Sequence, residues 1–222
     1  MMMMTMATRV TAAVALMSVT MLMPACRSAY YGTMEAFGHH KRDILVDRVE
    51  EARNDQQKAK EQFRDALEAF NAVVNVPPSE LRDTYERLNA EHKRSQSRAE
   101  DVQTRIRKVD EVAKDLFKEW ETEIDTYTNE NLRRRSEDQL RDTRFRYEQL
   151  YRAMTRAESK MQPVLNAFSD QVLFLKHNLN AQAVASLQGE VDHLETEIAE
   201  LIRDMESAIA EADSFINAMS SE

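Results

Sequence analysis

Residues 191–219 read VDHLETEIAELIRDMESAIAEADSFINAM, and the spacing of their apolar residues decides the fold class. Leu194, Ile198 and Leu201 belong to a stripe in which steps of three and four residues alternate along the whole segment. Such steps place every member on one face of an α-helix, and the seven-residue repeat is typical of helices packed as a coiled coil. Further isoleucines widen this stripe, which predicts a long helix in contact with two neighbours.

The same repeat occurs in three earlier segments. The four predicted helices span residues 31–75, 79–128, 136–178 and 181–218. Pro77-Pro78 separates the first two, because proline is tolerated only at the start of a helix. Ser136 is the predicted N-terminal cap of the third helix, and Pro163 is expected to kink it. The second helix has a polar middle around His92 and is expected to run as far as Tyr127.

The composition agrees with an all-α protein. The 222 residues include only three glycines and four prolines, whereas 31% are charged and 7% aromatic. Sheet-rich folds need many turns, and turns need glycine and proline. Short connections make successive helices antiparallel. We therefore expect an elongated antiparallel coiled-coil bundle of about four long helices, which forms a single domain over residues 26–222.

The N-terminal segment has the pattern of an export signal. Arg9 precedes a short apolar stretch at residues 10–23, and Ala25 stands directly before Cys26. The stretch is shorter than the roughly 20 residues of a membrane-spanning helix. Its end resembles a lipobox, which implies cleavage after residues 1–25 and acylation of Cys26. The alternatives are an ordinary signal peptide with an accidental cysteine, or an uncleaved anchor.

Lipidation would also account for the cysteine content. Cys26 is the only cysteine, so it cannot form an intramolecular disulfide, and a free exported thiol would be reactive. Several acyl chains give stable anchoring where a single chain is marginal. The predicted address is the cell envelope, with the bundle facing the periplasm. Arg27, in the position where Asp favours inner-membrane retention, favours the outer membrane.

Two polar groups are candidate sites. Glu35, His39 and Asp43 fall on one helical face at steps of four residues, which makes them a metal-site candidate; the alternative is a solvated polar face. His177, Asn178 and Asn180 follow a very apolar stretch. They are candidates for a polar recognition pocket, or for helix caps, the role in which asparagine is common. We favour caps.

Most enzyme classes lack support in the sequence. Three scattered glycines cannot build a phosphate-binding loop, and no Gly-x-Ser-x-Gly or His-Glu-x-x-His motif occurs. The formal net charge of −9 does not attract nucleic acid, and the run at residues 133–135 is interpreted as a solvated helix end. We expect no cofactor, no catalytic residue and no nucleic-acid partner.

Two stretches carry a resemblance to a known family. They are Tyr30-Tyr31 with Gly38-His39-His40-Lys41-Arg42-Asp43-Ile44-Leu45-Val46, and Met161-Gln162-Pro163-Val164-Leu165 with residues 172–181. They resemble the family called domain of unknown function 2959 (DUF2959), whose members look like proteobacterial helical lipoproteins. The resemblance covers nearly the whole mature chain and implies the fold and the address, but it carries no catalytic residue.

These features predict an envelope lipoprotein with a structural, tethering or scaffold role. Its expected partners are membrane lipid, through acylated Cys26, and either a second copy of itself or another envelope protein. The alternative is a periplasmic bundle that binds a small ligand or a lipid. In that case the kink at Pro163 would open a cavity near His177.

Overall fold

The structure is a computed structural model, and it describes residues 41–221. The chain divides into two units, residues 1–43 and residues 44–222, and the fold described below is that of the second unit. Within the described part every regular element is a helix, which confirms the all-α prediction. No helix of this part has the length and apolar character needed to cross a membrane.

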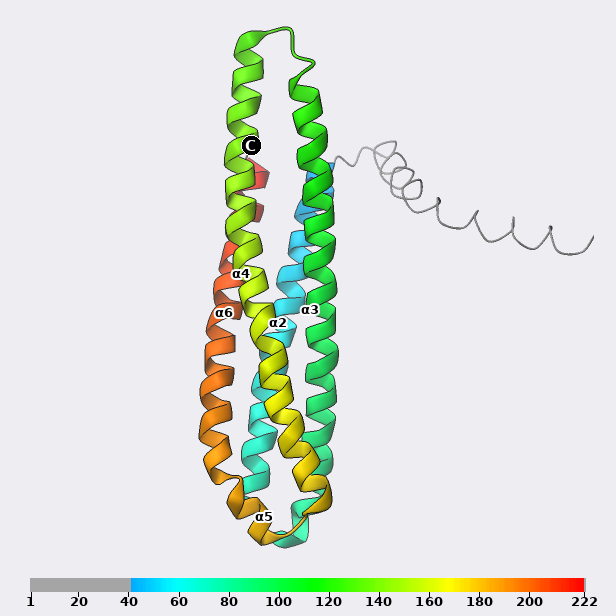
Figure 1. Ribbon diagram of the computed structural model, residues 1–222, viewed down its shortest axis with the longest axis vertical. Helices are drawn as coiled ribbons and strands as arrows, with labels where there is room; N and C mark the ends of the chain where they lie inside the picture. The colour runs from blue at the N-terminus through cyan, green and yellow to red at the C-terminus, as the bar shows by residue number, and fades with distance from the viewer. Residues whose placement is uncertain (1–40, 222) are drawn as a thin grey trace, which may run out of the picture. The chain divides into compact units, whose positions relative to one another are not determined.

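Four long helices and two short ones make up the fold (Figure 1). They are α2 (Lys41–Val74), the 3₁₀ helix η1 (Pro78–Glu80), α3 (Leu81–Ile124), α4 (Glu130–His177), α5 (Ala181–Ser186) and α6 (Gln188–Ser221). The helices α2 and α6 have 34 residues each, whereas α3 has 44 and α4 has 48. At 1.5 Å per residue the long helices measure roughly 50 to 70 Å.

The long helices pack side by side in the order in which they occur along the chain, and each runs antiparallel to the next. Contacts join α3 to α4 and α4 to α6. Ion pairs then close α6 against α2: Arg53 contacts Asp213 at 2.7 Å, and Lys60 contacts Glu206 at 3.4 Å. Because the residue number rises along α2 as it falls along α6, these two helices run in opposite directions. The end of α3, the turn at residues 125–129 and the start of α4 lie beyond the end of α6, as Figure 1 shows. We call this part the hairpin tip.

The core lies along the predicted apolar seams. The side chains that follow the seven-residue spacing along α2, from Leu45 to Val73 and including Gln56, are buried, and so are those of α6. Large side chains with almost no exposure occur along the bundle: Phe63, Phe70, Leu45, Leu88, Leu150, Met154, Met161, Leu175, Ile198, Leu201 and Met205. Some predicted positions of α3 are less buried: His92 and Trp120 are half-buried, and Tyr127 is 43% exposed because α3 ends at Ile124, before that residue.

Two helix starts differ from the prediction: the predicted helix 181–218 is divided at Leu187 into α5 and α6, and α4 starts earlier than expected. Helix α4 begins at Glu130, not at position 136, because Asn129 is its cap: its side-chain oxygen accepts hydrogen bonds from the backbone N–H groups of Asn131 (2.9 Å) and Leu132 (3.2 Å). Ser136 therefore lies inside the helix, where its hydroxyl accepts a hydrogen bond of 2.8 Å from the indole N–H of Trp120 on α3. Ser136, predicted as a cap, thus links α4 to α3 instead.

Two prolines mark changes of direction. Pro77 precedes the 3₁₀ turn η1, so the first helix ends where the sequence predicted. Pro163 lies within α4, which continues through it to His177. In Figure 1 the yellow C-terminal part of α4 is inclined to its green N-terminal part, as expected for a helix with an internal proline.

Candidate functional site

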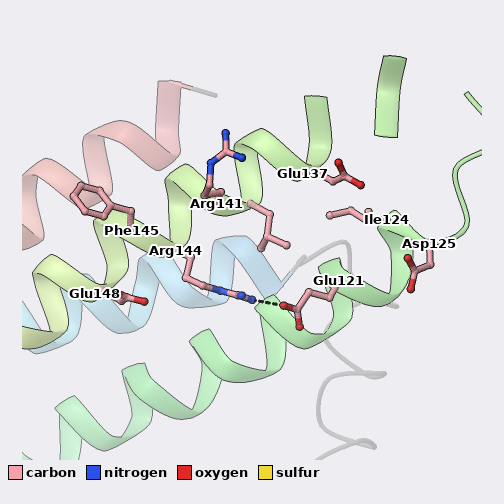
Figure 2. Close-up of a pocket in the computed structure, with 9 residues that line it drawn as sticks. Glu121, Ile124, Asp125, Glu137, Arg141, Arg144, Phe145 and Glu148 are labelled. Carbon is pink, nitrogen blue, oxygen red and sulfur yellow. Dashed lines mark hydrogen bonds and ion pairs between the residues drawn. The ribbon is translucent and has the colours of Figure 1, made fainter. Parts of the chain in front are cut away.

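A pocket of about 550 Å³ lies at the hairpin tip, between the end of α3 and the start of α4. Figure 2 shows the side chains around it. The lining residues are Glu121, Ile124, Asp125, Glu137, Leu140, Arg141, Arg144, Phe145 and Glu148. Its volume is within the range of about 300–1,000 Å³ that holds small molecules. Residues of two helices line it, so it depends on how α3 and α4 pack.

The charges of this tip pocket are mostly acidic. Of its lining residues four are carboxylates and two are arginines. Arg144 donates to Glu121 at 2.9 Å, and its guanidinium lies 5.1 Å from the centre of the Phe117 ring. Arg141 pairs with Asp138 at 2.7 Å, outside the pocket lining. Since both arginines are engaged, the pocket presents Asp125, Glu148 and apolar surface to a ligand, which favours a cationic and partly apolar one.

An aromatic cluster around Tyr147 lies beside the tip pocket. The ring of Tyr147 is 5.5 Å from that of Phe117, 5.9 Å from that of Tyr151 and 6.5 Å from that of Phe215. Its hydroxyl donates to Asp110 at 3.1 Å. Burial raises the pKa of Tyr147 well above its ordinary value, and the Asp110 carboxylate raises it further. The phenol therefore stays protonated and acts as a hydrogen-bond donor in the core.

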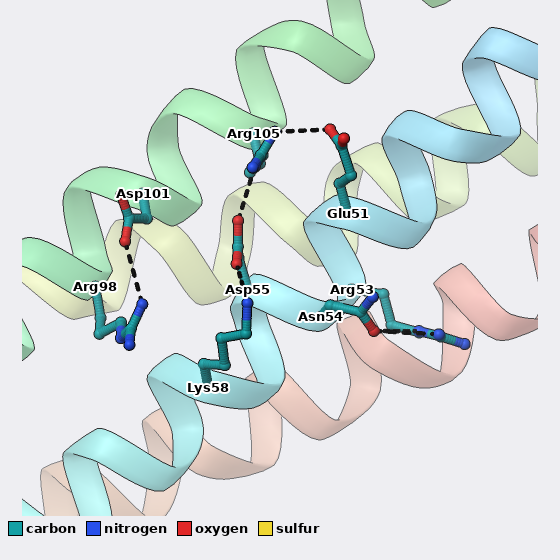
Figure 3. A network of polar contacts seen from close by, with 8 residues as sticks. All are labelled: Glu51, Arg53, Asn54, Asp55, Lys58, Arg98, Asp101 and Arg105. Carbon is teal, nitrogen blue, oxygen red and sulfur yellow. Dashed lines mark hydrogen bonds and ion pairs between the residues drawn. The ribbon is translucent and has the colours of Figure 1, made fainter.

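A second polar group joins α2 to α3 in the middle of the bundle (Figure 3). Arg105 of α3 contacts Glu51 at 2.7 Å and Asp55 at 2.8 Å, and Lys58 contacts Asp55 at 3.1 Å. Burial alone would raise the pKa of Asp55, but the hydrogen bonds from Arg105 and Lys58 outweigh it and hold the pKa below its ordinary value. These contacts fix the pairing of the two helices and offer no vacant charge for catalysis.

The bundle core also contains polar side chains. Gln56 is fully buried, and among the described residues neither atom of its amide finds a hydrogen-bond partner. The Thr143 hydroxyl is buried in the same way, whereas Ser95 donates to the backbone carbonyl of Glu91 at 2.9 Å. The sequence places Gln56 in a seam but cannot show that nothing opposite satisfies it. A buried amide of this kind lowers stability and is a candidate for a specificity role.

His92 lies half-buried between α3 and α4. Its ring is 5.6 Å from that of Phe168. Burial is the main reason that its pKa lies below the ordinary value; Lys93 acts in the same direction, and a hydrogen bond with the Leu165 backbone opposes them. The imidazole is consequently neutral near pH 7. A neutral ring packed against a phenylalanine serves the core, and within residues 41–221 no carboxylate pairs with it.

The structure brings the predicted polar cluster to a helix junction, where its asparagines act as caps. The side-chain amide of Asn178 donates to the Phe174 carbonyl at 3.0 Å at the end of α4. The side-chain oxygen of Asn180 accepts from the Ala183 backbone N–H at 3.0 Å at the start of α5. His177 is exposed on the last turn of α4. The capping interpretation is the one that these contacts support.

The remaining predicted sites fall largely outside the described residues. Cys26 and two members of the metal candidate, Glu35 and His39, precede residue 41, and Asp43 is the one member that the structure describes. Among residues 41–221 no group of three histidine, cysteine or acidic side chains is placed to hold a metal ion. The arginine run at the hairpin tip is partly engaged: Arg133 pairs with Glu137 at 3.0 Å, and Arg134 hydrogen-bonds Asn131.

Comparison with known proteins places the chain in a family. The model of a family described as a protein of unknown function (DUF2959) matches residues 30–219. No curated protein and no solved structure matches the chain. The match spans most of the chain, including every long helix of the bundle and the hairpin tip. The chain therefore belongs to the DUF2959 family, as its sequence resemblance predicted.

Proposed function

We propose that this protein is an envelope lipoprotein whose helical bundle is a non-catalytic spacer or tether. The observation that supports this most is the continuity of the core. Buried apolar side chains extend from Leu81 and Val184 at one end to Leu140 and Met219 near the other. A bundle packed along its whole length behaves as a stiff element, and it can hold partners at a fixed separation.

The packing around Pro163 supports a spacer rather than a ligand-binding bundle. Val164 and Leu165, directly after this proline, are each 3% exposed, and Phe168 is 2% exposed. A pocket lined by Gln162 and Leu165 has a volume of about 190 Å³. That is below the range of about 300–1,000 Å³ usual for ligand sites. The inclination of α4 therefore does not open a ligand-sized cavity at this pocket.

Stiffness can be measured directly in the native membrane. Spin labels at Gln149→Cys and Asp170→Cys, both exposed on α4, are separated by about 32 Å at 1.5 Å per residue and lie on either side of Pro163. We expect one narrow distribution of inter-label distances in pulsed electron paramagnetic resonance. A broad or double distribution would show that the bundle bends at Pro163, and the spacer role would then have to be abandoned.

The proposed membrane localisation is argued from the sequence before residue 41. An apolar stretch ending at Ala25-Cys26 supports lipidation. We expect mass spectrometry of the native protein to find a chain that begins at Cys26 and carries acyl groups. The protein should fractionate with the outer membrane, and Cys26→Ala should release it. A native chain that begins upstream of Cys26 without acyl mass would contradict the assignment.

The tip pocket is the observation that favours the alternative, a bundle that binds a small ligand. Among the described residues no ion pair engages its carboxylates Asp125 and Glu148, which would attract a cationic amphiphile. Spermine and dodecylamine are suitable probes. If the pocket is a site, either should raise the melting temperature of the full-length protein, and Asp125→Asn with Glu148→Gln should remove the shift. An equal shift in the double variant would assign binding to the general acidity of the chain.

A further inference from the structure

Two segments at one end of the bundle are nearly free of charge. Residues 69–79 contain no charged side chain, and residues 171–189 contain Lys176 alone, in a chain of which 31% is charged. The two segments meet at the same end, because the ring of Phe70, in the first segment, is 5.8 Å from that of Phe168, just before the second (Figure 1, lower end). We call these two segments the neutral end. Four of its exposed residues are amides, Asn75, Asn180, Gln182 and Gln188, which hydrogen-bond without adding charge.

The neutral end carries an exposed apolar ridge on α4. Leu173 is 56% exposed and Phe174 is 40% exposed, although they stand between the buried residues Val172 and Leu175. Lys176 and His177 follow after the buried Leu175, and both are exposed. We call these four exposed residues the α4 ridge. Two large apolar side chains beside a positive charge on an otherwise neutral surface are typical of a contact surface.

The same end also contains a hollow. A pocket of about 560 Å³ lies at the turn from α2 through η1 to α3. Its apolar part consists of Ala72, Val76 and Pro77, and its acidic part consists of Glu80 and Asp83, with Arg87 as the one basic residue among those that line it. In the described part of the chain no ion pair engages Glu80 or Asp83. We call this hollow the η1 pocket.

We propose that two copies of this chain dock through their neutral ends, with the α4 ridge of each copy in the η1 pocket of the other. Leu173 and Phe174 match the apolar part of the pocket, and Lys176 matches Asp83 beside it. Because ridge and pocket belong to the same end of one chain, each copy can give and receive the same contact. Such an isologous contact closes on itself and stops at a dimer.

Charge favours a second copy as the occupant. The chain has a formal net charge of −9, so two copies repel each other over most of their surfaces. This repulsion is weakest where charges are absent, and the neutral end is such a place. Lys176 makes the ridge positive, and Glu80 and Asp83 outnumber Arg87 in the pocket beside it, so the opposite net charges fix the orientation of the two copies. The contact does not depend on a lipid anchor.

A photo-crosslinking experiment tests the contact in the full-length protein in its own membrane. The probe is a benzophenone amino acid in place of Phe174. We expect a covalent dimer in which position 174 is joined to a peptide that contains residues 72–87 of the second copy. The matched control carries the probe at Phe145, which is also on α4, is 57% exposed and lies at the hairpin tip. The control should give no such dimer.

Substitutions measure the strength of the contact in purified full-length protein by analytical ultracentrifugation. Phe174→Glu should weaken dimerisation about 30-fold, the loss expected for a residue at the centre of an interface. Lys176→Glu should weaken it less, and Asp83→Lys in the same chain should restore it. A folding defect would not be restored in this way, and circular dichroism should show equal helix content in every variant.

Three results would overturn the proposal. One is a monomer at all accessible concentrations, and another is a dimer that Phe174→Glu leaves intact. The third is a crosslink from position 174 to lipid or to another protein in place of a second copy. None of these results bears on the acylation of Cys26, so this inference and the proposed envelope role can fail independently.

Discussion

The buried amide of Gln56 gives the sharpest test of the core. The side chain has no exposed surface, and neither its nitrogen nor its oxygen has a hydrogen-bond partner among the described residues. An amide moved from water to such a place costs about 1–3 kcal/mol in protein substitution data. Methionine has a similar length and volume and no amide, so Gln56→Met removes this cost and leaves no cavity.

We expect Gln56→Met to raise the free energy of unfolding by about 1–3 kcal/mol. For a protein of this size each kcal/mol raises the melting temperature by roughly 2–4 °C. Urea titration followed by circular dichroism at 222 nm measures the change, and an unaltered slope would show that the unfolded surface is the same. The control is Gln149→Met, at an exposed position on α4, which should change stability by less than about 0.5 kcal/mol.

A loss of stability in Gln56→Met would refute this reasoning. It would mean that the amide is satisfied in solution, since removing a bonded buried group is costly. The gain in stability also has an expected cost in specificity. Polar residues in a coiled-coil seam select one alignment of the helices, so Gln56→Met should allow other alignments or assemblies. Ultracentrifugation of the variant would detect them.

Three further predictions concern ionisable groups. Arg105→Met should cost about 1 kcal/mol near pH 7. The difference should shrink in acid, because a lowered Asp55 pKa stabilises the fold above its ordinary pKa of 3.8 and this stability is lost as the pH falls through the lowered value. His92→Leu should flatten the stability curve on the acid side of pH 6.5: in the wild type the unfolded state takes up the proton first, so stability falls as the pH drops. Tyr147→Phe should lose about 1 kcal/mol with the bond to Asp110. It should also lack the wild type's decline in stability above pH 10, where the unfolded phenol ionises and the buried one does not. Urea titrations across the pH range measure all three, and parallel curves for a variant and the wild type would contradict the corresponding assignment.

The helices and their buried faces could be predicted from the sequence, because a seven-residue repeat records which side of each helix meets the core. The start of α4 could not. Asn129 and Ser136 are both good caps by residue type, and only the packing of Trp120 against α4 shows that the serine hydroxyl is used elsewhere. Local preference leaves such a choice open until tertiary contacts decide it.

The candidate sites were harder to predict than the fold. The asparagines at residues 178 and 180 stood out because they follow an apolar stretch, and the structure uses them as caps. The tip pocket gave no signal, since residues far apart in the sequence line it and the alignment of α3 with α4 sets its shape. The lack of a partner for Gln56 was hidden for the same reason: periodicity shows that a residue faces inward, but not what faces it.

Because the chain has a single tryptophan, its fluorescence can report on the hairpin tip separately from the rest of the bundle. Trp120 is half-buried between α3 and α4, where its indole holds Ser136. Intrinsic fluorescence therefore reports the opening of this hairpin, while the ellipticity of the whole chain reports the bundle. If the fluorescence transition precedes the other on heating, the two-helix tip melts as a separate cooperative unit. If the fluorescence and ellipticity transitions coincide, the hairpin tip and the rest of the bundle unfold in one step.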